Sequence, residues 1–271
     1  MKITTKHLLA LFLTFLIVWA LVTAPAPLSE SVVDSGEGWI PIQQVFQTVA
    51  TENEIARTLY TKRIVGAGLK VQLKFDELWQ DENVHAGPLP ALFLRESARI
   101  IAQDPIPLLL YLGSHQPISE SNQFSGIQLS KFESILRSRV SNFFHEEKSN
   151  QYTAMYPDFA SVAACVTCHN QHPKSPKKDW KIDDIMGATT WSYPKEKVSS
   201  AEYLEIIRAV RSGLAGAYRG YLRKIDSFSE QPEIGSRWPS EGFYIPDEAT
   251  FMAEFHRLAA PATAQALLGT P

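Results

Sequence analysis

Both cysteines of this chain stand in one five-residue motif. Cys165 and Cys168 are separated by two residues, and His169 follows directly. This spacing is short for a structural disulfide, so the fold must be held by a hydrophobic core rather than by disulfide bonds. Hydrophobic residues make up 45% of the 271-residue chain, which is an ordinary share for a globular protein. The two thiols are therefore available for chemistry.

The motif has the C-x-x-C-H spacing that is typical of covalent haem attachment. In this arrangement each thiol forms a thioether with one of the two vinyl groups of the macrocycle. The histidine that follows is held beneath the iron, where its imidazole supplies the proximal ligand. We therefore predict one covalent haem c, bound by Cys165, Cys168 and His169.

Three other uses of the motif remain as alternatives. A thioredoxin-like C-x-x-C needs a strand-to-helix site in a βαβ unit. A structural zinc ion needs about four ligands, which here would include histidines such as His169 or His172. The third alternative is a disulfide. The adjacent histidine, the use of both cysteines in one motif and the signs of export favour haem.

The N-terminus indicates export. Lys2 and Lys6 are the only formal charges in residues 1–24, and residues 8–24 are apolar apart from two threonines. A short basic segment before an apolar stretch is typical of an export signal or membrane anchor, with a buried core helix as the alternative. Pro27 would hinder cleavage after Ala-Pro-Ala, so we expect an anchor in the inner membrane with the bulk of the chain on the periplasmic side.

The remaining composition divides the chain further. Residues 25–41 are rich in proline, serine and glycine, which suits a linker. We expect one domain at residues 42–213 and a C-terminal extension at residues 214–271 that packs on it. The formal net charge is −3, with 26 basic and 29 acidic residues. This balance argues against nucleic-acid binding, which needs clustered positive charge.

Apolar periodicity and capping signals predict helices that flank a few strands, hence an α+β fold. The predicted helices span residues 42–65, about 130–147, 160–164 near the cysteines, and 199–211. The predicted strands span residues 107–112, 152–156 and 185–193. Ser130 with Glu133, and Ser199 with Glu202, form possible capping boxes for two of the helices.

The motif and its surroundings resemble a known family, the PAS-like c-type haem domains of exported bacterial sensor and redox proteins, often catalogued as a domain of unknown function. The resemblance covers roughly residues 42–213. The strings that carry it are Cys165-Val-Thr-Cys-His-Asn-Gln-His-Pro173, Ser175-Pro-Lys-Lys-Asp-Trp-Lys181 and Asp184-Ile-Met-Gly-Ala188. The resemblance implies a PAS-like sheet with flanking helices, preceded by the N-terminal apolar helix, with haem against the sheet.

The sequence departs from this family at the second axial position of the iron. Some members place a cysteine there from the N-terminal helix, but this chain has no third cysteine, and residues 42–65 contain neither histidine nor methionine. The position is therefore either open or filled from elsewhere in the chain. The candidate ligands are Met155, Met186, His85, His115 and Tyr60.

These features predict redox sensing or electron transfer with a redox or signalling protein as partner. The alternative is a haem enzyme or small-gas binder that uses an open sixth site. No kinase or cyclase motif follows the domain, and no catalytic residue is predicted. Lysines crowd the segment after the motif, where they could neutralise haem propionates, dock an acidic partner or simply be solvated. They are Lys174, Lys177, Lys178 and Lys181.

Overall fold

The structure is a computed structural model that describes Thr14, residues 38–240 and residues 244–268. The predicted signal or anchor at residues 1–24 lies outside the described residues apart from Thr14, as does most of the predicted linker. No helix within the described ranges is both long and apolar enough to cross a membrane. From Trp39 onward the chain forms one compact unit.

A long helical run opens this unit. Helix α2 (Ile42–Leu59) passes through a π-helical turn, η2 (Tyr60–Val65), into the short helix α3 (Gly66–Lys70). Apolar residues recur every three or four positions along α2, so one face is buried. The buried apolar residues of this face are Ile42, Val45, Phe46, Val49, Ala56 and Leu59. The helix predicted at residues 42–65 is confirmed, and helical structure continues five residues further.

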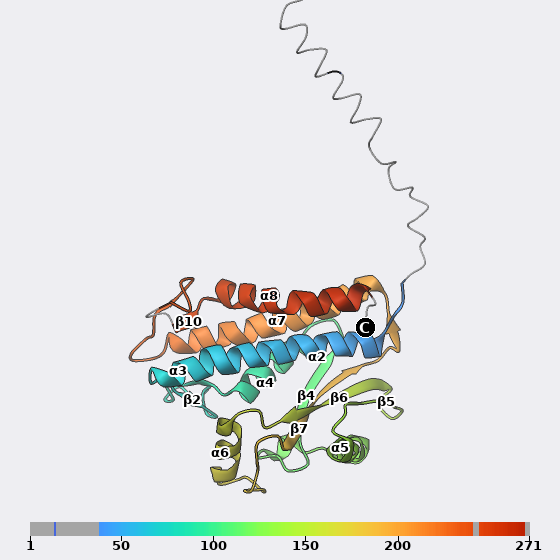
Figure 1. Ribbon diagram of the computed structural model, residues 1–271, viewed down its shortest axis with the longest axis horizontal. Coiled ribbons are helices and arrows are strands. Elements are labelled where there is room, and N and C mark those ends of the chain that lie inside the picture. Colours follow the sequence, from blue (N-terminus) through green and yellow to red (C-terminus); the bar gives the residue numbers. More distant parts are fainter. Residues whose placement is uncertain (1–13, 15–37, 241–243, 269–271) are drawn as a thin grey trace, which may run out of the picture. The chain divides into compact units, whose positions relative to one another are not determined.

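Three more helices pack with α2 into one layer. They are α4 (Pro90–Ile101), α7 (Ser200–Ile225) and α8 (Glu248–Leu268). Figure 1 shows α8, α7 and α2 side by side, with α4 between them and the sheet. Most of the large buried aromatic side chains lie in this helical layer.

A four-stranded antiparallel sheet lies against the helical layer. Its strands are β4 (Leu109–Gly113), β5 (Asn142–Glu146), β6 (Gln151–Phe159) and β7 (Ile185–Tyr193), in the order β4-β7-β6-β5. The strand predicted at residues 185–193 is confirmed at both ends. The strands predicted near β4 and β6 are also present, with bounds shifted by a few residues. The α+β class is therefore confirmed.

The sheet separates two hydrophobic cores. Successive side chains of a strand point to opposite faces. Ala154 and Trp191, which are paired across β6 and β7, pack against the helical layer. Met155 and Ala188 pack on the other face, beneath α5 (Gly126–Ser138). The α5 side of the sheet thus carries a second, smaller core.

The helix predicted at about residues 130–147 is wrong at both ends. α5 begins four residues earlier and ends at Ser138, because the left-handed backbone of Arg139 (φ 60°) stops the helix. The two adjacent phenylalanines that suggested a helical face lie in β5. Phe143 contacts Phe46 of α2 at 6.3 Å between ring centroids, while Phe144 contacts Lys131 of α5. Alternation in a strand, rather than helical periodicity, explains why both are apolar.

The N-cap predicted at the start of α7 is confirmed, whereas the carboxylate of Glu202, the other member of the predicted capping box, accepts from Tyr193 and Lys195. The hydroxyl of Ser199 accepts a hydrogen bond from the backbone N–H of Glu202 at 3.2 Å. The helix does not end at Arg211, however, and continues for 14 more residues to Ile225. Gly213, two residues after the predicted end, is a packing residue. A Cβ atom there would lie 2.5 Å from a side-chain carbon of Ile101, so glycine lets α4 approach α7 closely.

The predicted boundary at residues 213 and 214 lies within α7. The division between residues 42–213 and 214–271 falls inside a continuous helix whose second half is buried in the same core. Residues 39–271 form one compact unit, because α7 and α8 complete the core that α2 and α4 begin.

Short elements complete the fold at the edges of this unit. They are the paired strands β1 (Ile40–Pro41) with β8 (Lys197–Val198), β2 (Phe75–Asp76) with β3 (Gly87–Pro88) and β9 (Ile234–Gly235) with β10 (Ile245–Pro246), and the 3₁₀ turn η3 (Glu120–Asn122). The segment between β2 and α4 and the segment between β4 and α5 both approach the functional site described next.

Candidate functional site

The C-x-x-C-H motif lies on helix α6 (Ala163–Gln171), which is inserted between the adjacent strands β6 and β7. The helix begins three residues later than predicted, and it carries both cysteines. Cys165 and Cys168 are spaced at i and i+3, so they share one face of α6, and His172 follows the last residue of the helix. Both thiols are free; that of Cys165 is half-buried and that of Cys168 is exposed.

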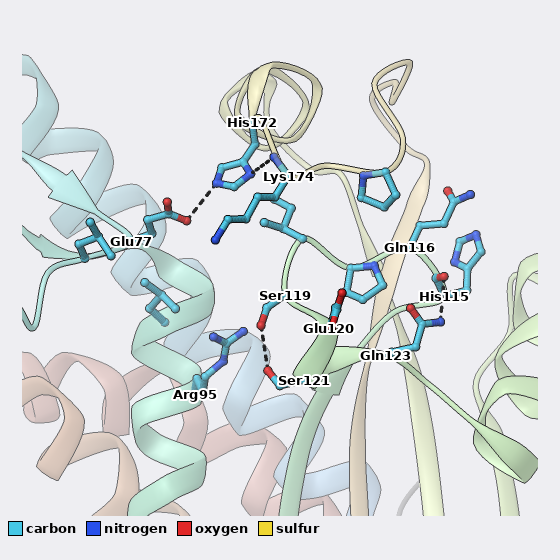
Figure 2. Close-up of a pocket in the computed structure, with 15 residues that line it drawn as sticks. Glu77, Arg95, His115, Gln116, Ser119, Glu120, Ser121, Gln123, His172 and Lys174 are labelled. Atoms are coloured by element: carbon cyan, nitrogen blue, oxygen red, sulfur yellow. Dashed lines mark hydrogen bonds and ion pairs between the residues drawn. The ribbon is translucent and has the colours of Figure 1, made fainter.

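Two contacts from distant segments hold the chain on either side of this helix. Arg57 of α2 forms an ion pair with Asp158 at the end of β6, with 2.5 Å between Nη1 and Oδ1. Glu77 lies 3.1 Å from His172 across the start of the cleft shown in Figure 2. The carboxylate of Asp158 raises the pKa of the Arg57 guanidinium although burial opposes it. Burial, followed by the charge of Glu77, raises the pKa of Cys168.

The connection from α6 to β7 is folded back onto the helix by side-chain hydrogen bonds. The side chain of Asn170 accepts from the backbone N–H of Trp180 at 2.8 Å and donates to its carbonyl at 3.0 Å. The hydroxyl of Ser175 donates to the carbonyl of Lys177, and Asp184 accepts from the N–H of Lys181. The strings that carried the family resemblance therefore have a structural role in shaping this loop.

The side chain of His169 is half-buried, and its ring Nδ1 is available as a ligand. Its ring stands edge-on to Trp180, with 6.4 Å between centroids. Its Nδ1 is buried without a hydrogen-bond partner among the described residues, as is Nε1 of Trp180. Burial, and then His172, lowers the pKa of His169, which favours the neutral imidazole that can ligate a metal.

A cleft of about 820 Å³ begins beside α6 (Figure 2). This volume lies within the ~300–1,000 Å³ that is usual for small-molecule and cofactor sites. The cleft is bounded by the loop that follows α6, by the segment around Glu77, by α4 and by the segment that leads from β4 to η3. Its lining residues are Glu77, Leu78, Leu92, Arg95, His115, Gln116, Pro117, Ile118, Ser119, Glu120, Ser121, Gln123, His172, Lys174 and Pro176.

In the structure, three of the five candidate axial ligands form contacts with other parts of the protein. Tyr60 is fully buried, stacks on Phe93 at 4.3 Å and donates its hydroxyl to the carbonyl of Pro88. Met155 is fully buried in the second core beneath α5. His85 is exposed and stacks on Phe228, just beyond the end of α7.

The other two candidates lie closer to the motif. Met186 lies in β7 at an irregularity of the β6–β7 pairing, and its carbonyl accepts from the hydroxyl of Ser114. His115 lines the cleft and also stands edge-on to Trp180, at 6.5 Å, so it shares a neighbour with His169. Its Nδ1 is buried without a partner in the described part of the chain, and burial lowers its pKa.

The sequence did not predict the residues that line the cleft opposite the motif segment. Glu77 and Arg95 come from segments 70 or more residues before the motif, and nothing in their local sequence pattern marks them. The described residues contain no group of three or more His, Cys, Asp or Glu side chains placed to hold a metal ion, such as the zinc alternative requires.

Fold and motif together define an α+β domain in which a C-x-x-C-H helix is inserted between two antiparallel strands. The chain belongs to the Tll0287-like family, a family of domains of unknown function whose model matches residues 42–194. The predicted resemblance began at the same residue but extended to 213, whereas the match stops before α7. No curated protein and no solved structure matches the chain.

Proposed function

We propose that this chain is an exported, single-haem c-type cytochrome-like protein with a PAS-like domain, acting in redox sensing or electron transfer. One observation carries the proposal. Helix α6 presents Cys165, Cys168 and His169 at the attachment spacing, with both thiols free and the imidazole uncommitted. The residues fit a covalent haem, because thioether attachment needs two reduced thiols and a neutral imidazole next to them.

Each residue has a distinct role in this proposal. Cys165 and Cys168 form the two thioethers, and His169 is the proximal ligand. Trp180 packs against the imidazole and restricts its orientation, and Asn170 fixes the backbone of Trp180. A bound haem supplies one-electron chemistry, with a potential that depends on its ligands and surroundings.

The cleft beside α6 supports the same proposal. Its walls combine apolar side chains with a few polar and charged ones, as a haem combines an apolar macrocycle with two carboxylates. The apolar side chains are Leu78, Leu92, Pro117, Ile118 and Pro176. Glu77, which interacts with the thiol of Cys168, is also a lining residue, so the cysteine face of α6 adjoins the cleft.

Covalent attachment is tested by intact mass after expression with a c-type haem maturation system. The wild-type chain should gain the mass of one haem, and the haem should resist acid extraction. Cys165→Ala or Cys168→Ala should weaken attachment, and the double variant should abolish it. Thr167→Ala, between the cysteines, is the matched control and should retain the haem. A wild-type chain without added mass would refute the proposal.

A second function, a haem enzyme or small-gas binder, depends on an open second axial position. Tyr60, Met155 and His85 are engaged or distant, which favours an open or weakly held site. We therefore expect CO to bind rapidly to the reduced protein, without thiolate character in the spectra. A six-coordinate low-spin spectrum in both redox states, lost in His115→Ala or Met186→Ala, would contradict this and identify the missing ligand.

Export and membrane association complete the proposal. Lys2, Lys6 and the apolar residues 8–24 motivate an inner-membrane anchor with the haem domain on the periplasmic side. Membranes washed at alkaline pH should retain the protein. A soluble chain that begins at Pro27 would show cleavage instead, and a cytoplasmic chain would refute export. The partner would be a redox or signalling protein.

A further inference from the structure

The cleft ends, on the side opposite His172, at an arginine without a partner. Figure 2 shows the side chain of Arg95 across the cleft from His172 and beside Ser119 and Ser121. Arg95 lies on α4 and forms no ion pair or side-chain hydrogen bond with another described residue. Its neighbour Arg99 is instead paired with Glu96 at 2.6 Å. An unpaired guanidinium in a cleft is free to bind an anion.

The polar groups beside Arg95 favour an anionic group at this end. Lys174, a second cation with no ion-pair partner among the described side chains, lies beside His172 at the other end of the cleft. Glu77 is already engaged by His172 at 3.1 Å, which leaves Glu120 as the other lining acid. The hydroxyls of Ser119 and Ser121 lie 2.9 Å apart near Arg95, and that of Ser121 also donates to Oδ1 of Asn122 at 3.4 Å; rotation away from these partners lets them donate to a ligand. Guanidinium and hydroxyl groups together suit a carboxylate.

The position of this donor group relative to the cysteines identifies the carboxylate. A haem attached through its vinyl groups carries both propionates on the opposite edge of the macrocycle. Cys165 and Cys168 lie on α6, which leads directly into His172 at one end of the cleft, and Arg95 lies at the other end. We propose that Arg95, with the hydroxyls of Ser119 and Ser121, binds a haem propionate. This inference rests on the proposed haem attachment.

Such a contact makes Arg95 a positioning residue that also tunes the haem. A positive charge near the macrocycle stabilises the reduced form, because reduction adds one negative charge. Replacing Arg95 by a neutral side chain therefore favours the oxidised form. Attachment itself does not change, since the thioethers are made at the other edge.

The test compares three variants of the haem-loaded protein: Arg95→Gln, Arg95→Lys and the control Arg99→Gln, one turn further along α4. Arg95→Gln should keep the haem by mass and shift the reduction equilibrium about three- to tenfold towards the oxidised form, where tenfold is about 59 mV for one electron. The propionate bending mode in resonance Raman spectra should shift too. Arg95→Lys should recover most of the potential, and Arg99→Gln should match wild type.

The outcomes separate the two proposals. If wild-type protein carries no haem, both the proposed function and this inference fail. If haem is attached but Arg95→Gln matches Arg99→Gln in potential and in the propionate mode, only the inference fails. Neither arginine is buried, so both variants should fold. Circular dichroism of the apo variants checks this.

Discussion

The helical layer and the motif segment are held together in different ways. In the helical layer, each of five aromatic rings contacts two of the others, and two of the pairs are stacked with 4.3 and 4.0 Å between ring centroids. These rings are Tyr60, Phe93, Phe251, Tyr218 and Tyr221. Helix α6 has no buried residue at all. A few hydrogen bonds and ion pairs position it instead.

This contrast separates a scaffold from a site. A layer built on buried apolar surface is stable without a ligand, whereas a helix held by polar contacts opens at a lower free-energy cost. His169 and Trp180 in this segment, and His115 in the cleft, also hold buried polar atoms that have no hydrogen-bond partner in the described part of the chain. Because such atoms are costly in a finished core, their presence beside the motif is consistent with a site that a cofactor completes.

The largest predicted effect concerns the scaffold. Glu52 is fully buried and is paired by Arg211 at 2.6 Å, while Thr263 donates to the same carboxylate at 2.7 Å. Arg211→Met leaves this carboxylate without its charge partner and should cost about 3–5 kcal/mol of unfolding free energy. Urea denaturation measures it. Arg208→Met, which removes an exposed arginine of the same helix, should leave the urea midpoint nearly unchanged, and equal losses would contradict the distinction.

Asn170→Ala should break the site without breaking the scaffold. The backbone N–H and carbonyl of Trp180 would lose their partners, at about 1–3 kcal/mol of local opening free energy. Hydrogen exchange should accelerate across α6 and residues 172–184, while the urea midpoint changes little. Asn83→Ala removes an exposed asparagine that bonds only to Asp81 and is the control. Uniform acceleration over the whole chain would show that α6 is part of the scaffold.

Met155→Leu tests whether the second core takes part in the site. Leucine nearly conserves the volume, so the substitution should cost less than about 1.5 kcal/mol. The haem spectrum should not change, because Met155 packs beneath α5. Loss of a low-spin signature in this variant, with stability retained, would make Met155 the second axial ligand.

The smallest effect is a pH dependence at the start of α7. Burial raises the pKa of Glu202, but hydrogen bonds from Tyr193 and Lys195 outweigh it and hold the pKa below its usual 4.5. A lowered pKa stabilises the fold above pH 4.5, and this contribution is lost as the pH falls through the folded-state value. Glu202→Gln should cost up to about 1 kcal/mol near neutrality and flatten the acid limb of the stability curve. Glu205→Gln, an exposed control, should keep the wild-type acid limb.

Local sequence patterns predicted those elements whose formation depends on residues close by in the sequence. The strand at residues 185–193 and the cap at Ser199 follow from alternation and from one hydrogen bond, so both were predictable. Phe143 and Phe144 were assigned to a helix because a short apolar run has no unique period. The helix predicted to end at Arg211 continues to Ile225, and it packs on α4 through contacts between distant residues such as Gly213 and Ile101.

Only part of the candidate site was predictable from the sequence. The chemistry of Cys165, Cys168 and His169 is contained in five consecutive residues, so the sequence alone determined the haem prediction and the helix face that carries it. Glu77 and Arg95 enter the site only because α6 folds back beside the segments that bear them. The tertiary structure also decided which candidate ligands are engaged elsewhere. Attachment chemistry is local in the chain, whereas the surroundings of a haem come from packing between distant segments.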